Sequence, residues 1–178
     1  QLPTGGGKSV VTSEVVDIFA KKTKVLVLAH KKELLEQMQS HFSNRQLDAG
    51  FMMGKRETNM DASVVIASVH TATREKRIET LLEYDYGLIV VDEAHRIASS
   101  SYENILNKIR EKNPKAKLLG ISATPFRKDR KDLRKYFQHM ICSESVQSLI
   151  QKGYLAKYQT YSTPVKDLDE EVEKSGDD

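Results

Sequence analysis

The sequence has a single cysteine, Cys142, and no apolar run that approaches the roughly 18 residues of a membrane-spanning helix. One cysteine cannot form a disulfide within the chain, which is typical of a reducing compartment. Secretory signal patterns and internal repeats are also absent. The five histidines form neither an HExxH motif nor a His/Cys cluster, which argues against a transition-metal site. We therefore expect a cytoplasmic (intracellular) protein without a membrane partner.

Composition favours one soluble globular domain. The 178 residues suffice for one domain with a real core and are too few for two large ones. Residues 165–178 hold two lysines and seven acids, a net charge of −5, so the remaining 26 basic and 18 acidic residues sum to +8. A basic body suits a polyanionic partner, although ordinary solvated surface also explains this charge. We expect residues 165–178 to be an acidic linker or disordered tail.

A glycine-rich stretch, LPTGGGKS, lies at residues 2–9 and precedes a helical apolar pattern. Such a turn exposes backbone N–H groups to a phosphate, and the helix N-terminus adds partial positive charge. Lys8 would then reach the β- and γ-phosphates, and the Ser9 hydroxyl would ligate Mg²⁺. Leu2 stands where the strict phosphate-loop pattern has glycine, so a flexible turn with a chance lysine is the alternative. Because the chain begins inside this motif without Met, we expect a fragment whose preceding strand is missing.

Strand and helix patterns alternate along the chain, which indicates an α/β domain with a mostly parallel sheet. The apolar runs that predict buried strands are 24–28, 63–69, 86–91 and 117–121. Helices are expected at 8–20, 31–43, 73–83, 102–112, 130–137 and 145–152, and a last extended piece at 157–163. Residues 44–62 are mixed, with Gly50 and Gly54 as turn signals.

Polar residues follow each predicted strand. They are His30 and Lys31, then Ser68, His70 and Thr71, then Asp92, Glu93 and His95, and finally Ser122 and Thr124. Because ligands of parallel sheets bind beyond the carboxyl ends of the strands, these residues and the glycine loop predict one composite site.

Asp92 and Glu93 directly follow the hydrophobic run Leu88–Val91. In a phosphate-loop enzyme, the first acid helps to hold Mg²⁺, and the second orients and deprotonates the attacking water. A surface turn or a helix N-cap at Asp92 is the alternative. The hydrophobic run that leads to the two acids is expected to be buried, which argues against a simple helix N-cap.

The motifs PTGGGKS, VVDEAH and SAT, in this order, resemble the first motor domain of superfamily 2 helicases and translocases of DEAH-box type. LVLAHKKELLEQ, IVVDEAHRI, LLGISATPFR and KGYL are most similar to the type III restriction and RadD-like, DNA-directed branch. The resemblance covers residues 1–164 and implies a RecA-like ATP-binding domain with helices on both faces of the sheet.

The resemblance also implies roles for individual residues. It assigns binding of ATP to Thr4, Gly5, Gly6, Gly7, Lys8 and Ser9. Mg²⁺ would be held by Ser9 and Asp92, with Glu93 as the catalytic acid. His95 would couple hydrolysis to the loop of Ser122, Ala123 and Thr124.

Further residues fall where family members touch the nucleic-acid backbone, with DNA favoured over RNA. They are His30, Lys31, Gly54, Ser68, His70 and Thr71. A local bond at a strand or helix end explains either histidine nearly as well. Arg127 and Lys128 fit the path of the strand or plain surface charge equally.

The resemblance implies that a second RecA-like domain of the same full-length chain completes the motor. In related phosphoryl-transfer systems, arginine fingers contribute about 10³–10⁵ in rate. We therefore expect the isolated fragment to be weakly active.

Several other functions remain as alternatives. A GTPase would show an NKxD motif, but the nearest string, Asn107–Arg110, lacks the aspartate. A pure binding module has no use for Lys8, Asp92 and Glu93 together. A motor subunit of a restriction or defence nuclease, or a nucleotide-dependent switch without unwinding, fits the same motifs.

Overall fold

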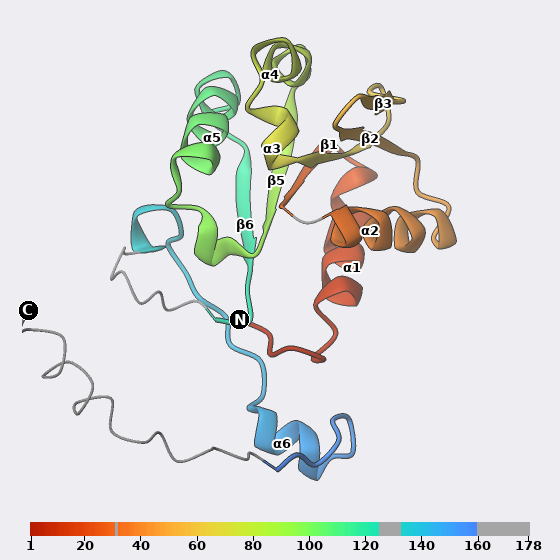
Figure 1. The fold of residues 1–178 in the computed structure, drawn as a ribbon, viewed down its shortest axis with the longest axis vertical. Coiled ribbons are helices and arrows are strands. Elements are labelled where there is room, and N and C mark those ends of the chain that lie inside the picture. Colours follow the sequence, from red (N-terminus) through yellow and green to blue (C-terminus); the bar gives the residue numbers. More distant parts are fainter. Residues whose placement is uncertain (31, 125–132, 160–178) are drawn as a thin grey trace, which may run out of the picture.

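The computed structural model describes residues 1–30, 32–124 and 133–159, with the backbone alone at 32–34 (Figure 1). The expectations for Lys31, for Arg127 and Lys128, and for the tail 165–178 lie outside the described residues, as does most of the extended piece expected at 157–163.

A six-stranded sheet, in the order β3-β2-β4-β1-β5-β6, forms the centre of the described chain. The strands are β1 (Lys24–Ala29), β2 (Ala49–Met53), β3 (Arg56–Thr58), β4 (Val64–Ser68), β5 (Tyr86–Asp92) and β6 (Lys117–Ile121). Every pairing is parallel except that of β3 with β2. The expected mostly parallel sheet is confirmed.

Helices cover both faces of this sheet. They are α1 (Lys8–Ala20), α2 (Lys32–Asn44), α3 (Val69–Ala72), α4 (Glu75–Leu82), α5 (Ser100–Lys112) and α6 (Val146–Gln151), with 3₁₀ turns at Ala94–Arg96 and Leu133–Lys135. Helices α1 and α2 pack on one face, and α3, α4 and α5 on the other, whereas α6 lies apart from both layers (Figure 1). This is the RecA-like arrangement of helices around a parallel sheet. Among the described residues, no helix combines the length and apolar character needed to cross a membrane.

Alternate side chains of the central strands point to opposite faces, which divides the core into two layers. Leu26 and Leu28 of β1 join the cluster beneath α3, α4 and α5. Val25 and Val27 join the cluster beneath α1 and α2. All four are fully buried, as an apolar strand covered on both faces requires.

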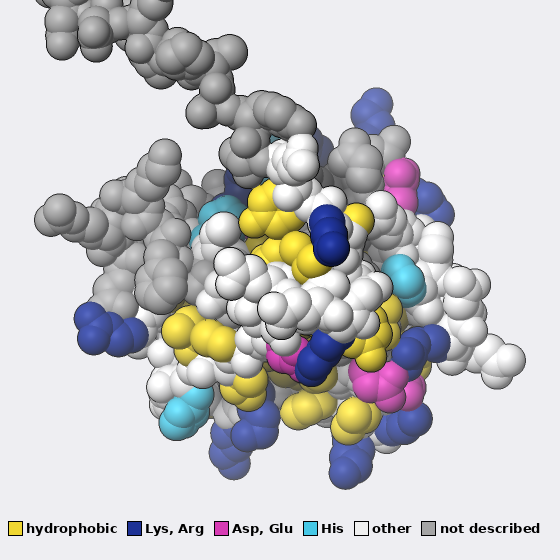
Figure 2. Space-filling view, turned by 90° about the horizontal axis from the view of Figure 1, so that it is seen from below, with side chains coloured by type: hydrophobic (Ala, Val, Ile, Leu, Met, Phe, Trp, Pro, Cys, Tyr) yellow, Lys and Arg dark blue, Asp and Glu magenta, His cyan; other side chains and the backbone are white. Residues whose placement is uncertain are grey.

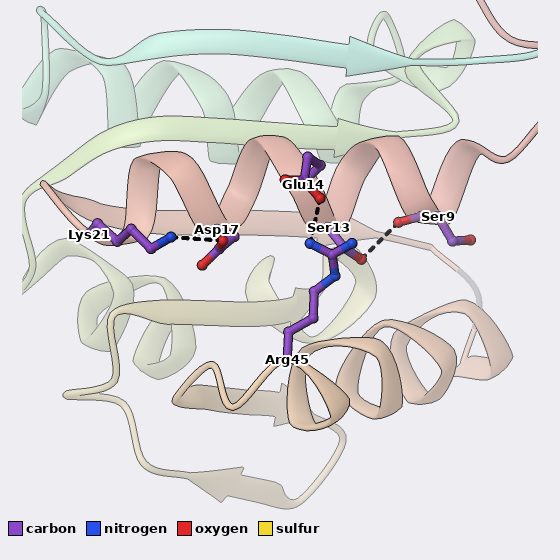
Figure 3. Close-up of polar contacts among 6 residues, drawn as sticks. All are labelled: Ser9, Ser13, Glu14, Asp17, Lys21 and Arg45. Atoms are coloured by element: carbon purple, nitrogen blue, oxygen red, sulfur yellow. Dashed lines mark hydrogen bonds and ion pairs between the residues drawn. The ribbon is translucent and has the colours of Figure 1, made fainter.

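Surface contacts add to the α1–α2 layer. Arg45, just after α2, reaches Glu14 of α1 at 2.5 Å, and Lys21 pairs with Asp17 at 3.0 Å (Figure 3). Nearer the start of α1, the Ser13 hydroxyl donates to the carbonyl of Ser9 at 2.8 Å (Figure 3). Exposed ion pairs contribute little, so burial of apolar side chains holds this layer.

The mixed region 44–62 holds the antiparallel hairpin of β2 and β3. Gly54 lies in its turn with φ 59°, as expected, but Gly50 lies inside β2. A side chain at Gly50 would overlap the carbonyl oxygen of Asn59, so glycine is required here by close backbone approach.

Two other boundaries differ from the sequence prediction. The strand predicted at 63–69 ends at Ser68, where α3 begins, and within 130–137 the described part holds only the 3₁₀ turn Leu133–Lys135.

Candidate functional site

The loops predicted to form one site do lie at one edge of the sheet, because β1, β2, β4, β5 and β6 run parallel. The strand order divides this edge into two groups. The ends of β5 and β6 bring the two acids beside Ser122. The ends of β1, β4 and β2 bring together His30, Ser68 and Gly54. The two groups meet where β1 lies beside β5.

The glycine loop adopts a conformation that few other residues tolerate. Gly5 has φ 78° and Gly7, the residue before α1, has φ 80°. The Gly6 N–H donates to the Pro3 carbonyl at 3.0 Å, which closes the turn. A Cβ on Gly7 would meet nothing within 4 Å, so the space beside the start of α1 is open. Unpaired N–H groups at a helix start suit a phosphate in that space.

Backbone bonds fix this loop against the end of β6. The Leu2 N–H donates to the Ser122 carbonyl at 3.1 Å, and the Gln1 side-chain amide donates to Ala123 at 3.2 Å. On the other side, the Ser143 N–H donates to the Gln1 carbonyl at 2.9 Å. The SAT segment is therefore held beside the glycine loop, as a composite site requires.

The segment after α6 also reaches the glycine loop. Leu155 Cδ2 lies 2.8 Å from where a Cβ on Gly5 would stand. The backbone N–H groups of Tyr154 and Leu155 both donate to the Leu149 carbonyl, which fixes the turn that carries Leu155. The KGYL motif thus contacts the glycine loop although the two lie far apart in the sequence. No local sequence pattern predicts this contact.

Asp92 is a buried carboxylic acid, with 5% of its surface exposed. Burial raises its pKa, and the neighbouring charge of Glu93 raises it further. A backbone hydrogen bond and the positive charges of Lys8 and His95 act in the opposite direction. Lys8 therefore lies near enough for its charge to act on Asp92, as joint binding of Mg²⁺ and phosphate would require.

Glu93 occupies the left-handed region, with φ 52° and ψ 51°. His95 follows in a 3₁₀ turn, and its Nδ1 lies 3.2 Å from a Glu93 carboxylate oxygen and 3.1 Å from Ser122 Oγ. The Thr124 N–H donates to the same Ser122 oxygen at 3.1 Å. One chain of contacts thus connects Glu93, through His95, to the SAT loop.

Ser9 and Asp92 offer hydroxyl and carboxylate oxygens, the ligand types that Mg²⁺ takes. Within the described residues, no cluster of three or more His, Cys, Asp or Glu could hold a metal alone. Mg²⁺ keeps several waters and is held by one or two protein oxygens together with substrate phosphates.

The predicted nucleic-acid residues form the second group and differ in exposure. His30 and His70 are exposed, whereas Ser68 and Thr71 are buried, with 6% and 2% exposed. The Gly54 N–H donates to the Thr71 hydroxyl at 2.7 Å, which joins the turn of the hairpin to α3.

Arg77 was not singled out from the sequence, yet it lies at this second group. It pairs with Glu57 of β3, and its guanidinium donates to the carbonyls of Gly54 and Lys55 at 3.4 and 3.3 Å. A lone arginine in a charged helix carries no signal for such a contact, because the hairpin that it binds lies 20 or more residues earlier in the chain.

Comparison with known proteins gives a consistent picture. The profile described as "Type III restriction enzyme, res subunit" matches residues 1–127. The "51.5 kDa protein" of Lactococcus phage (isolate 7-9) is 32% identical over 178 residues, which cover 99% of this chain and 35% of that protein. The "Putative ATP-dependent helicase IRC3" of Saccharomyces cerevisiae is 28% identical over 193 residues, which cover 99% of this chain and 27% of that protein.

The fold is also found among solved structures. The Hef helicase domain of Pyrococcus furiosus superposes with a TM-score of 0.57 at 24% identity, over 71% of this chain and 29% of that one. This chain spans about a third or less of the length of these relatives.

Proposed function

This chain belongs to the type III restriction enzyme res-subunit family as the first, RecA-like motor domain of a superfamily 2 helicase, and we propose that it binds and hydrolyses ATP with Mg²⁺ while contacting a nucleic-acid backbone. On this proposal, residues 1–164 form the motor domain and 165–178 a linker to a second RecA-like domain. The intact motor acts in the cytoplasm on nucleic acid, with DNA favoured.

The chain of contacts from Glu93 through His95 to Ser122 is the observation that most supports this proposal. It joins the predicted catalytic acid to a loop that also holds the glycine loop in place. A simple nucleotide-binding module needs a phosphate cradle but no such connection. A motor needs such a connection, because ATP hydrolysis has to change how the domain binds the nucleic acid.

In this mechanism, the backbone N–H groups of Gly7, Lys8 and Ser9 surround the phosphates of ATP, and Lys8 neutralises the charge on the β- and γ-phosphates. When bound, Mg²⁺ stabilises the negative charge that develops on the phosphates. Ser9 and Asp92 would hold that ion. Glu93 orients the attacking water and accepts its proton.

The Nδ1 atom of His95 contacts both the Glu93 carboxylate and the Ser122 hydroxyl. A change of charge at Glu93 would therefore alter the position of the SAT loop. We propose that this loop transmits the hydrolytic state toward the nucleic-acid group and toward a second domain. In that group, His30, Lys31, Gly54, Ser68, His70 and Thr71 contact the sugar–phosphate backbone.

The test is the ATPase rate of the full-length protein with single-stranded DNA, duplex DNA and RNA, using Glu93→Gln as the inactive variant. Loss of the general base should lower kcat by about 10²–10⁴-fold and leave ATP binding intact. Glu83→Gln is the matched control, because Glu83 is exposed just before β5, at the opposite edge of the sheet.

Strong stimulation by DNA alone supports a DNA motor of the restriction or repair branch. Stimulation by RNA alone would keep the mechanism and overturn the DNA preference. ATP binding without stimulation by any nucleic acid would leave a nucleotide-dependent switch, and the motor proposal would be wrong.

A further inference from the structure

The turn between β2 and β3 is held from outside the hairpin by two residues of the helices that follow β4. Arg77 of α4 makes an ion pair with Glu57 and donates to the carbonyls of Gly54 and Lys55. Thr71 of α3 accepts from the Gly54 N–H at 2.7 Å. Both backbone hydrogen-bonding groups of Gly54 are therefore engaged by helices of the neighbouring βα unit.

The buried part of the hairpin is β2, whose residues 50–52 are buried, and not β3. All three residues of β3 are exposed, and a short exposed edge strand supplies little stability of its own. Although Glu57 is exposed as a whole residue, only 29% of its side chain is exposed, and only 22% of the Arg77 side chain. A shielded pair that also binds two backbone carbonyls holds a defined geometry better than an exposed pair does.

The fixed turn presents cations toward solvent at the edge that carries His70. Lys55 and Arg56 directly follow Gly54 and are exposed, as are Arg74 and Lys76 at the start of α4. The Arg56 guanidinium lies 5.1 Å from the centre of the Phe51 ring, which limits the directions it samples. Glu57 and Glu75 are acids within this surface, and Arg77 pairs with Glu57.

We propose that Arg77 and Glu57 form a clamp that positions Lys55 and Arg56 as phosphate-binding residues for a single nucleic-acid strand. This proposal rests on the proposed function, because it assumes a nucleic-acid partner at this edge. Arg77 is a positioning residue in it and does not itself bind the strand. The clamp would keep the hairpin fixed relative to α3 while the nucleic-acid strand moves past both.

The direction in which one charge substitution changes the affinity for nucleic acid distinguishes a clamp from a purely electrostatic contribution. Glu57→Ala removes a negative charge from a surface that binds a polyanion and frees Arg77. If Arg77 were a direct phosphate contact, this variant would bind nucleic acid more tightly. If Arg77 and Glu57 form a clamp, the same variant binds more weakly, because the turn loses its fixed position.

The experiment measures binding of a fluorescein-labelled oligo(dT) strand to the full-length protein by anisotropy across a range of salt concentrations. We expect Glu57→Ala and Arg77→Ala each to weaken binding by about tenfold, and Glu57→Gln, which still accepts from Arg77, to weaken it less. Lys55→Ala combined with Arg56→Ala should reduce the slope of log K against log salt by about 1.4, as expected for two single-strand phosphate contacts. In that double variant, Glu57→Ala should have little further effect.

Matched controls come from other exposed positions. Glu79→Ala removes a negative charge from α4, the helix that carries Arg77, and Arg110→Ala removes a cation from α5; neither should weaken binding. In the ATPase assay, Glu57→Ala should raise the DNA concentration for half-maximal stimulation and change the rate at saturating DNA by less than about twofold. Thermal melting curves report whether each variant is folded.

Unchanged or tighter binding by folded Glu57→Ala, with a wild-type protein that binds DNA, would overturn the clamp and leave the proposed function standing. A wild-type protein that neither binds nucleic acid nor responds to it in the ATPase assay would overturn both.

Discussion

At the scale of single residues, Glu93 is the position where backbone conformation and proposed chemistry coincide. A non-glycine residue in the left-handed region costs about 1–2 kcal/mol. Glu93 adopts this conformation, with φ 52°, and its carboxylate lies 3.2 Å from His95. Strain of this kind clusters at functional sites, because the surrounding structure has to maintain it. The buried carbonyl of Asp92 accepts from the Tyr102 hydroxyl at 3.4 Å, which helps to hold the strand end from which Glu93 departs.

Tyr86, like Tyr102, is a buried tyrosine whose titration should affect stability at alkaline pH. Burial raises the pKa of its phenol, and among the described residues its hydroxyl has no hydrogen-bond partner. In the unfolded chain the phenol loses its proton near pH 10, whereas in the fold it retains it. The unfolded state then binds fewer protons, so the free energy of unfolding should fall as pH rises above about 10.

Tyr86→Phe should lessen that alkaline fall and leave stability at pH 7 unchanged or higher by up to about 1 kcal/mol. Thermal melting between neutral pH and alkaline pH measures both effects. Tyr158→Phe is the control, because Tyr158 is 68% exposed. An equal alkaline loss in wild type and Tyr86→Phe would contradict the assignment.

At the scale of elements, α2 shows which kind of contact holds a helix on this sheet. Leu35 and Phe42 are fully buried in the cluster beneath α1 and α2. The ion pair from Arg45 to Glu14 is short, at 2.5 Å, but its side chains are 34% and 56% exposed (Figure 3). Solvent screens such a pair, so packing should dominate.

We therefore expect Phe42→Ala to cost about 3–5 kcal/mol and Arg45→Ala less than about 1 kcal/mol. Urea denaturation of the two variants tests the comparison, and added salt should alter only the effect of Arg45→Ala. Comparable losses from both substitutions would show that the ion pair contributes far more than its exposure suggests.

At the scale of the whole molecule, charge is separated between the body and the acidic tail. Residues 1–164 carry a net charge of +8 and residues 165–178 carry −5. The face seen from below in Figure 2 shows more Lys and Arg side chains than acidic ones, interspersed with hydrophobic side chains. A positive surface attracts a polyanion, and an acidic segment of the same chain competes with the polyanion for that surface.

A chain of residues 1–164 should therefore elute from heparin at higher salt than residues 1–178. The physical reason is that removal of 165–178 raises the net charge from +3 to +8. A scrambled tail of the same composition serves as the control and should elute with the full chain. Earlier elution of the shortened chain would contradict the charge argument.

Several properties were predictable because their signals are local. The apolar runs 24–28, 86–91 and 117–121 are strands, and the parallel sheet places their polar ends at one edge. The conformation of the glycine loop follows from Gly5 and Gly7, whose positive φ values few other residues adopt. Gly50 was misjudged because a glycine required by close backbone approach looks, in sequence, like a glycine required by a turn.

The sequence by itself determined the alternation of elements and the motif residues of the candidate site, since each depends on residue type and short spacing. The helices on both faces were expected only from the resemblance to a known family. Only the tertiary structure decided the strand order, which separates the residues proposed for hydrolysis from those proposed for nucleic-acid contact. It also decided that Arg77 reaches Glu57 and that Leu155 reaches Gly5. These contacts join residues 20 to 150 positions apart, where chain connectivity imposes no register and only packing of complete elements selects the partners.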